Sequence, residues 1–142
     1  MRENADRVIR FVLNRLEGGG RLVQSKKDPG GLTKWGFSQR WNPDIDVRSL
    51  DEEGAVERAL ERYWVPAGSD ELAWPWDAVA FDCSFNFGLD DVADINKASP
   101  VNWQDFLLMR MVRHMTKSGD NTFPLLLRCL RLYNWIKTQK GG

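Results

Sequence analysis

The sequence predicts a mainly α protein of the α+β class, a helical bundle with a small glycine-rich β lobe after the first helix. Three observations lead to this prediction. Apolar residues recur at three- and four-residue spacing over residues 3–16. Residues 21–47 lose that period and are rich in glycine and proline. From residue 49 onward, five further segments have helical character. With 142 residues, the usual size of one domain, we expect a single domain over residues 1–142.

The first helix is expected over residues 3–16. Its end is predicted by Gly18-Gly19-Gly20, because consecutive glycines favour helix termination. After it, extended pieces are expected at Leu22-Val23 and Trp35-Gly36-Phe37, which would form a small hairpin or an irregular lobe. The residues expected on the buried face of the first helix are Ala5, Val8, Ile9, Val12 and Leu16.

The later helices follow in order. Ser49-Leu50-Asp51-Glu52 has the pattern of a capping box at a helix start, and Pro66 is expected to end that helix. Residues 76–87 are apolar on most sides, which predicts a central buried helix with Gly88 as its C-cap. A short helix is expected at residues 90–98, and two longer helices are expected at residues 102–117 and 124–138. The residues expected along the apolar stripe of the second helix are Ala55, Val56, Ala59, Leu60, Tyr63 and Trp64.

Charge and composition exclude several classes of protein. Lys+Arg and Asp+Glu each number 20, so we expect no dedicated nucleic-acid binder. No apolar run approaches the about 18 residues of a membrane-spanning helix. The charged N-terminus leads into an amphipathic segment, unlike a signal peptide. Residues 1–100 have a net charge of −5 and residues 101–142 a net charge of +5. The basic C-terminal part could favour binding of an anionic polymer, or its charges could simply form a solvated helix face.

Cysteine and histidine offer little catalytic chemistry here. Cys83 and Cys129 lie in apolar helical contexts, so we expect buried free thiols in preference to a disulfide. Together with His114, the only histidine, they cannot form a recognisable zinc site, and no metal or cofactor is expected. His114 has no nucleophile motif nearby, so we expect an ordinary surface or half-buried helix residue.

Glu17 is the first candidate catalytic residue. At the end of the first helix it meets the negative end of the helix dipole, which favours the protonated carboxyl that a general acid needs. Asp28 lies eleven residues further on, in a Pro-Gly-Gly turn, and the two carboxyls flank a glycine-rich segment. Paired carboxyls are the basic equipment of glycoside hydrolysis, and Thr33 could hold the attacking water. The same residues could equally be an ordinary surface glutamate and a turn-capping aspartate.

The seven tryptophans divide by context. Trp35 and Trp41 lie in the glycine-rich lobe and are candidates to face a glycan. Trp64, Trp103 and Trp135 fall at helical spacing among apolar residues, which predicts core packing. Trp74 and Trp76 bracket Pro75 before the buried helix and are not assigned to either class.

These motifs resemble the muramidases of glycoside hydrolase family 108, which are phage endolysins and related peptidoglycan hydrolases. Their pattern is Glu-Gly-Gly, a variable loop, Asp-Pro-Gly-Gly-x-Thr-x-x-Gly, and a short hydrophobic-Ser/Thr-Gln segment. The matching positions are Leu16-Glu17-Gly18-Gly19, Asp28-Pro29-Gly30-Gly31, Thr33, Gly36, Phe37-Ser38-Gln39, Tyr63-Trp64 in part, and the run from Asp82 to Gly88. The resemblance covers roughly residues 8–90.

The resemblance implies a lysozyme-like fold and a set of roles. Glu17 would donate a proton to the glycosidic oxygen, Asp28 would stabilise the sugar cation or help to activate water, and Thr33 would position that water. Gln39 and Asn86 would line the cleft and bond sugar hydroxyls or N-acetyl groups. Where the family commonly has an aromatic residue soon after Glu-Gly-Gly, this chain has Gly20-Arg21.

The implied function is cleavage of the β-1,4 bond between N-acetylmuramic acid and N-acetylglucosamine in peptidoglycan. Asp28 and Thr33 favour hydrolysis over lytic transglycosylation, which needs no water-holding group. A chitinase-like enzyme and a non-catalytic phage structural or wall-binding domain are two further functions that the sequence leaves open. A Glu17–Asp28 carboxyl separation of about 5–5.5 Å would suit a retaining mechanism and about 6.5–9.5 Å an inverting one.

The resemblance also implies a biological setting. We expect a monomer made in the host cytoplasm that acts on the cell wall, or one carried in the virion. An endolysin without a signal peptide would need a membrane-permeabilising partner for its release. No other protein or nucleic-acid partner is expected.

Overall fold

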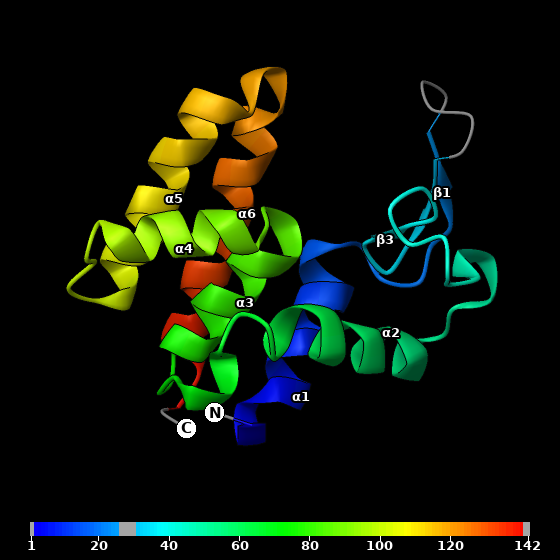
Figure 1. Ribbon diagram of the computed structural model, residues 1–142, viewed down its shortest axis with the longest axis horizontal. Coiled ribbons are helices and arrows are strands. Elements are labelled where there is room, and N and C mark those ends of the chain that lie inside the picture. Colours follow the sequence, from blue (N-terminus) through cyan, green and yellow to red (C-terminus); the bar gives the residue numbers. More distant parts are fainter. Residues whose placement is uncertain (1, 26–30, 141–142) are drawn as a thin grey trace. The chain divides into compact units, whose positions relative to one another are not determined.

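The structure, a computed structural model, describes residues 2–25 and 31–140. Within these residues the chain forms six α-helices and one three-stranded antiparallel sheet (Figure 1), which confirms the mainly α, α+β class. The chain divides into two compact units. Residues 6–61 form the lobe unit, and residues 1–5 with 62–142 form the helical unit. The single domain expected over the whole chain stays a prediction.

The first helix confirms the predicted segment, with a change of geometry at its end. Helix α1 (Arg2–Phe11) continues into a π-helical turn, η1 (Val12–Leu16). Such wider turns are rare and often occur at functional sites. Four of the five residues predicted for the inner face are buried, and Leu16 is half-buried. Leu13 is also fully buried, because it follows Ile9 by four residues and therefore lies on the same face of the helix.

A small antiparallel sheet follows, with strand order β1-β2-β3. It comprises β1 (Val23–Gln24), β2 (Leu32–Lys34) and β3 (Phe37–Ser38). The extended piece predicted at Trp35-Gly36-Phe37 is wrong for its first two residues, because Trp35 and Gly36 form the turn of the β2–β3 hairpin. Their φ angles are +55° and +79°. Two positive φ angles are typical of a two-residue hairpin turn, whose twist matches that of the strands.

The second long helix begins later than its sequence pattern predicts. The capping box at Ser49 is wrong, because Ser49 belongs to a short 3-10 helix, η2 (Val47–Ser49), and its hydroxyl donates to Asp46. Helix α2 (Glu52–Ala59) is capped by Asp51, whose Oδ1 accepts a hydrogen bond from Gly54 N at 2.8 Å. A π-helical turn, η3 (Leu60–Trp64), prolongs it and ends before Pro66, as predicted.

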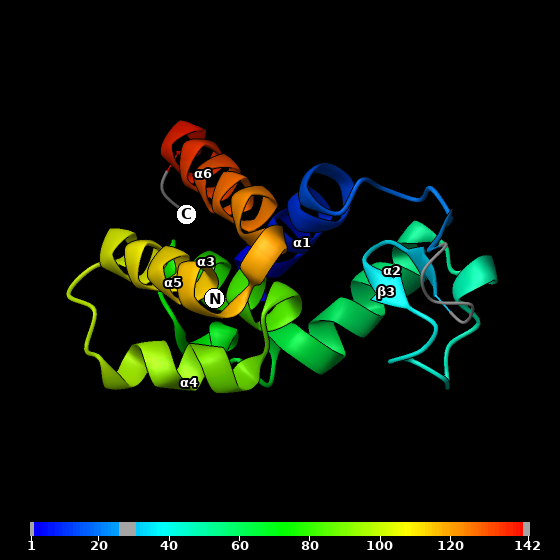
Figure 2. The ribbon, with the colours of Figure 1, turned by 90° about the horizontal axis from the view of Figure 1, so that it is seen from above.

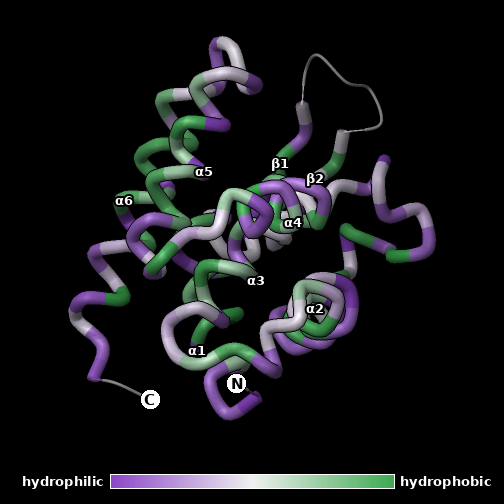
Figure 3. The backbone as a smooth tube through the Cα atoms, turned by 60° about the vertical axis from the view of Figure 1, so that its left-hand side comes forward, coloured by the Kyte–Doolittle hydropathy of each residue, from purple (hydrophilic) through white to green (hydrophobic). Residues whose placement is uncertain are grey.

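The helical unit contains four of the α-helices. After a 3-10 turn, η4 (Ser69–Glu71), come α3 (Trp76–Asn86), α4 (Leu89–Lys97) and α5 (Trp103–Lys117). A second 3-10 turn, η5 (Gly119–Asn121), leads into α6 (Thr122–Thr138), which lies beside α5 (Figures 1 and 2). Hydrophobic and hydrophilic residues alternate along α5 and α6 (Figure 3). None of the described helices is both long and apolar enough to cross a membrane.

Helix α3 forms the centre of the helical unit, as its sequence predicts. Every residue from 77 to 84 is buried, because apolar residues cover most sides of this helix. Its C-cap is Phe87, so the prediction that Gly88 would cap it is wrong by one residue. Gly88 has a φ of +125° and its amide donates to Cys83 O, which closes the helix end.

The tryptophans of the helical unit pack against other aromatic rings. Trp64 is fully buried, which confirms its core position, whereas Trp103 and Trp135 are half-buried. Trp74, which the sequence left unassigned, makes an edge-to-face contact with Trp135 at 5.8 Å between ring centroids. Trp76 makes a similar contact with a buried phenylalanine. Both therefore belong to the packing of this unit.

Cys83 and Cys129 are free and buried, as predicted. Burial raises the pKa of Cys83 to about 12 and raises that of Cys129, so both stay protonated thiols at neutral pH. The prediction of a surface or half-buried His114 is wrong, because this residue is fully buried. Its ring stacks on Phe87 at 4.1 Å between centroids, and Nε2 accepts from Arg110 Nε at 3.1 Å.

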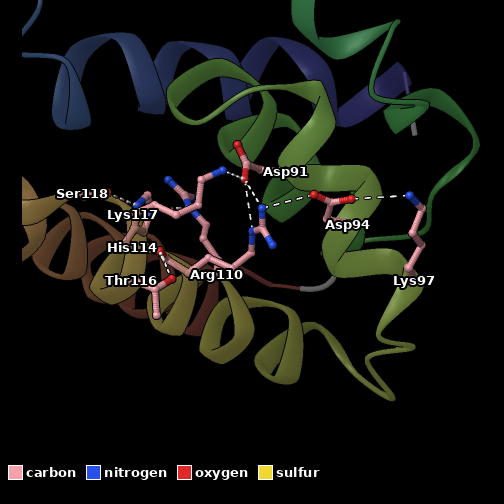
Figure 4. A network of polar contacts seen from close by, with 9 residues as sticks. Asp91, Asp94, Lys97, Arg110, His114, Thr116, Lys117 and Ser118 are labelled. Carbon is pink, nitrogen blue, oxygen red and sulfur yellow. Dashed lines mark hydrogen bonds and ion pairs between the residues drawn. The ribbon is translucent and has the colours of Figure 1, made fainter.

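Charged side chains join α4 to α5. Asp91 Oδ1 accepts from Arg113 Nη2 at 2.6 Å and from Lys117 Nζ at 2.9 Å (Figure 4). Burial raises the pKa of Asp91, but hydrogen bonds from the two cations outweigh this and hold it below its usual value. Asp91 is therefore a carboxylate at neutral pH.

Candidate active site

Glu17 caps the π-helical turn at the end of the first helix. Its amide donates to Val12 O at 2.9 Å, and Gly19 N donates to Leu13 O at 2.9 Å. Gly18 and Gly19 have φ angles of +80° and +74°, a conformation that favours glycine and that ends the helix at this point. The glycines therefore set the helix terminus as predicted, and the half-buried Glu17 lies at its negative end.

Helix α1 and the turn that follows it are connected to α2 by polar contacts. Arg10 Nη1 lies 3.0 Å from Glu52 Oε1 and 2.9 Å from Glu53 Oε1, and Asn14 Nδ2 donates to Glu52 Oε1 at 3.1 Å. Hydrogen bonds from Asn14 and Arg10 hold the pKa of Glu52 below its usual value. Sequence reasoning missed these supporting residues. The four-residue spacing of Arg10 and Asn14 indicates that they share a helix face, but it does not predict which residues of α2 they contact.

Thr33 lies in the middle of β2, the central strand. It pairs with Val23 of β1 on one side and with Ser38 of β3 on the other. Thr33 is half-buried. Because it is paired on both sides, the backbone of Thr33 is fixed by two neighbouring strands. Asp28 lies outside the residues that the structure describes.

Gln39 anchors the loop after β3. Its Nε2 donates to Asn42 O at 3.0 Å and to Ile45 O, and its Oε1 accepts from Val47 N at 3.1 Å. Sequence reasoning assigned this amide to sugar binding and missed its role as a clamp on its own loop. An open hollow of about 500 Å³ lies beside it, lined by Gln39, Pro43, Asp44, Ile45 and Asp46.

The two candidate glycan-facing tryptophans have different surroundings. Trp35 is half-buried, its Nε1 donates to Leu50 O at 3.1 Å, and its ring lies against Gly20. A Cβ at Gly20 would come within 2.6 Å of Trp35 Cζ2. Trp41 is 78% exposed, and the Arg40 guanidinium lies 5.4 Å from the centroid of its ring. Trp41 is therefore the more accessible of the two rings.

Asn86 belongs to the helical unit, whereas the other described site residues belong to the lobe unit. It is the last residue of α3, and its Oδ1 accepts from Arg110 Nη2 at 3.0 Å. Arg110 Nη1 in turn lies 2.6 Å from Asp82 Oδ2, and Arg128 Nη2 lies 2.7 Å from Asp82 Oδ1. Asn86 is thus attached to a buried ion cluster, which sequence reasoning did not predict.

The charge state of this cluster follows from its composition. Burial raises the pKa of Asp82, but the charges of Arg128 and Arg110 outweigh burial and bring it to about 2. Asp82 is therefore ionised at neutral pH. In residues 2–25 and 31–140, no group of three or more His, Cys, Asp or Glu side chains is arranged to hold a metal ion.

The candidate site combines a carboxyl at a glycine-capped helix end with a hydroxyl on a central strand. A carboxyl can exchange a proton with a leaving oxygen, which is one of the two carboxyl roles in glycoside hydrolysis, and a hydroxyl can hold a water. The model of the family described as Glycosyl hydrolase 108 matches residues 9–88, more than half of the chain. A search of curated proteins finds no match. The matched segment contains every candidate site residue, and the chain therefore belongs to the glycosyl hydrolase 108 family.

Proposed function

We propose that this glycosyl hydrolase is a muramidase. Its substrate is peptidoglycan, and the bond that it hydrolyses is the β-1,4 linkage between N-acetylmuramic acid and N-acetylglucosamine. In this proposal Glu17 is the general acid, Thr33 positions the attacking water, and Asp28 stabilises the developing sugar cation or helps to activate the water. Gln39, Asn86, Trp35 and Trp41 contact the glycan.

The observation that carries the proposal is the placement of Glu17. It is half-buried at the end of a π-helical turn, followed by two glycines with positive φ angles. A general acid must be held at a fixed place beside the glycosidic oxygen, and the end of the helix fixes the backbone of Glu17.

The hydroxyl of Thr33 supports hydrolysis over transglycosylation. In hydrolysis a water attacks the sugar carbon, its proton passes to a base, and the leaving oxygen takes the proton of the acid. A transglycosylase uses a hydroxyl of the sugar itself as the nucleophile and leaves an anhydro-muramic end. Thr33 sits on the central strand, where pairing on both sides holds its backbone in one position.

We further propose that the protein acts on bacterial cell walls as a phage endolysin or as a virion-associated lysozyme. The family resemblance supports both roles equally. An endolysin would act with a membrane-permeabilising partner, whereas a virion-associated enzyme needs none. A monomer suffices for either role.

The decisive variant is Glu17→Gln, which removes the acidic proton and keeps the size of the side chain. We expect loss of about 10²–10⁴-fold in the release of reducing ends from purified peptidoglycan, with an unchanged circular dichroism spectrum. Glu57→Gln is the matched control, because Glu57 is exposed on α2 and should leave the rate unchanged.

Mass spectrometry of the products decides which bond is broken and how. Hydrolysis gives reducing N-acetylmuramic ends, and anhydro-muramic ends would identify a transglycosylase instead. Cleavage of chitin oligomers without cleavage of peptidoglycan would indicate a chitinase-like enzyme. A folded Glu17→Gln protein with full activity would remove Glu17 from the mechanism.

A further inference from the structure

Arg110 joins three groups at the end of α3. Its Nη1 pairs with Asp82 at 2.6 Å, its Nη2 donates to Asn86 Oδ1 at 3.0 Å, and its Nε donates to His114 Nε2 at 3.1 Å. Arg110 is fully buried, and it lies on α5 close to His114 in Figure 4. Because all three of its nitrogens are engaged, the guanidinium is held in one orientation.

This contact determines which end of the Asn86 amide is offered to solvent. A guanidinium has donors and no acceptor, so the Asn86 atom that faces Arg110 is the oxygen. The Asn86 Nδ2 group donates to none of the described residues. No buried side-chain nitrogen or oxygen in the described part of the chain lacks a hydrogen-bond partner. The Nδ2 group is therefore not completely buried, and no described residue accepts either of its hydrogens.

We propose that Arg110 is a positioning residue, which turns the Asn86 amide so that its NH₂ group is presented to the glycan. The inference rests on the proposed function, in which Asn86 contacts the sugar. Arg110 lies beyond the segment that the family model matches, residues 9–88, so the helical C-terminal part takes a share in substrate recognition.

The orientation selects the chemistry of the substrate group. The NH₂ group of Asn86 donates hydrogen bonds, so the substrate atom that it contacts must be an acceptor. The carbonyl oxygen of an N-acetyl group is the acceptor that distinguishes an N-acetylated amino sugar from glucose. Asp82 and His114 contribute by fixing Arg110, because a guanidinium free to turn would allow the amide to flip. The predicted preference is for an N-acetylated sugar at the subsite that Asn86 serves.

The first test is Asn86→Asp, measured on soluble glycan strands from peptidoglycan. The carboxylate keeps an acceptor for Arg110 and gains an ion pair, so we expect an unchanged or higher melting temperature. It presents an oxygen where the amide presented donors, so we expect KM to rise about tenfold or more with a small change in kcat. Asn134→Asp, on the exposed surface of α6, is the matched control with an unchanged KM.

The second test is a double-mutant cycle between Arg110→Lys and Asn86→Ala. Lysine keeps a charge for Asp82 but cannot engage all three partners with one nitrogen. If Arg110 acts through Asn86, Arg110→Lys raises KM in the wild-type background and has no further effect on KM in the Asn86→Ala background. Arg113→Lys, on the same helix and paired with Asp91, should leave KM unchanged.

The outcomes separate this inference from the proposed function. A wild-type KM in folded Asn86→Asp overturns the positioning role, as does an equal effect of Arg110→Lys in both backgrounds. If Arg110→Lys fails to fold, Asn86→Asp decides. If the wild-type protein releases no products, the muramidase proposal fails. Calorimetric binding of N-acetylglucosamine oligomers then tests the inference, and equal affinity of wild type and Asn86→Asp overturns it.

Discussion

Thr33 offers the sharpest test at the scale of a single residue. Valine has nearly the shape of threonine and suits a central strand, so Thr33→Val should leave the melting temperature within a few degrees of wild type. Loss of the hydroxyl should lower the rate of peptidoglycan hydrolysis by about 10–100-fold, because a misplaced water attacks poorly. Thr33→Ser, which keeps the hydroxyl, is the control and should retain most of the rate. Equal activity of the valine and serine variants would contradict a water-holding role.

Individual site residues differ in how far the sequence predicts their roles. The place of Glu17 follows from local rules, because a helical apolar pattern ends at consecutive glycines. The clamp made by Gln39 and the hydrogen bond from Trp35 to Leu50 do not follow from such rules. Both connect side chains to backbone groups of a loop whose path no periodicity determines. The sequence places these residues in the right lobe but not their partners.

At the scale of elements, the start of α2 provides a direct comparison of two caps. Asp51→Ala removes the acceptor of the Gly54 amide and should lower the free energy of unfolding by about 1 kcal/mol. Ser49→Ala should cost less, because the Ser49 hydroxyl bonds to the Asp46 side chain and not to α2. Urea unfolding of both variants measures the difference. A larger loss for Ser49→Ala would favour the capping box that the sequence pattern predicts.

The elements themselves are predicted well where one signal dominates. The helices at 76–86, 89–97, 103–117 and 122–138 lie within two residues of their expected bounds, because their patterns are helical throughout. The β2–β3 turn was missed because a tryptophan, with a φ of +55°, occupies its first position. Local preference disfavours that conformation for a large side chain, and the packing of the lobe overrides it.

At the scale of the whole molecule, stability should depend on acid in two steps. Burial and the charge of Arg110 lower the pKa of His114 to about 4 from its ordinary value of 6.5. The unfolded chain therefore binds the proton first, and the free energy of unfolding falls as the pH drops from about 6.5 to about 4, by at most about 3 kcal/mol. The folded protein holds the pKa of Asp82 at about 2, below its ordinary value of 3.8. Below about pH 4 the unfolded chain therefore protonates Asp82 first, and the free energy of unfolding falls further down to about pH 2.

Chemical unfolding at a series of pH values measures both steps. His114→Gln should remove the dependence between pH 6.5 and 4, because glutamine can accept from Arg110 without titrating. The lower step should remain in that variant. A variant that keeps the full upper step would assign it to other groups.

The buried cluster of Asp82, Arg110 and Arg128 shows why whole-molecule features escape sequence reasoning. Asp82 lies 28 positions from Arg110 and 46 positions from Arg128 along the chain, and the three meet only through the packing of α3, α5 and α6. In the sequence, the two arginines look like the solvated charges of amphipathic helices. The net charge of +5 in residues 101–142 therefore overstates the free positive charge of this part.

The contact between Gly20 and Trp35 has a consequence for how relatives of this protein vary. The family pattern commonly has an aromatic residue soon after Glu-Gly-Gly, and here the indole of Trp35 lies against Gly20, directly after that motif. A side chain at position 20 and an indole at position 35 would compete for one volume. The two positions should therefore covary in an alignment, with bulky residues at 20 accompanied by smaller residues than tryptophan at 35.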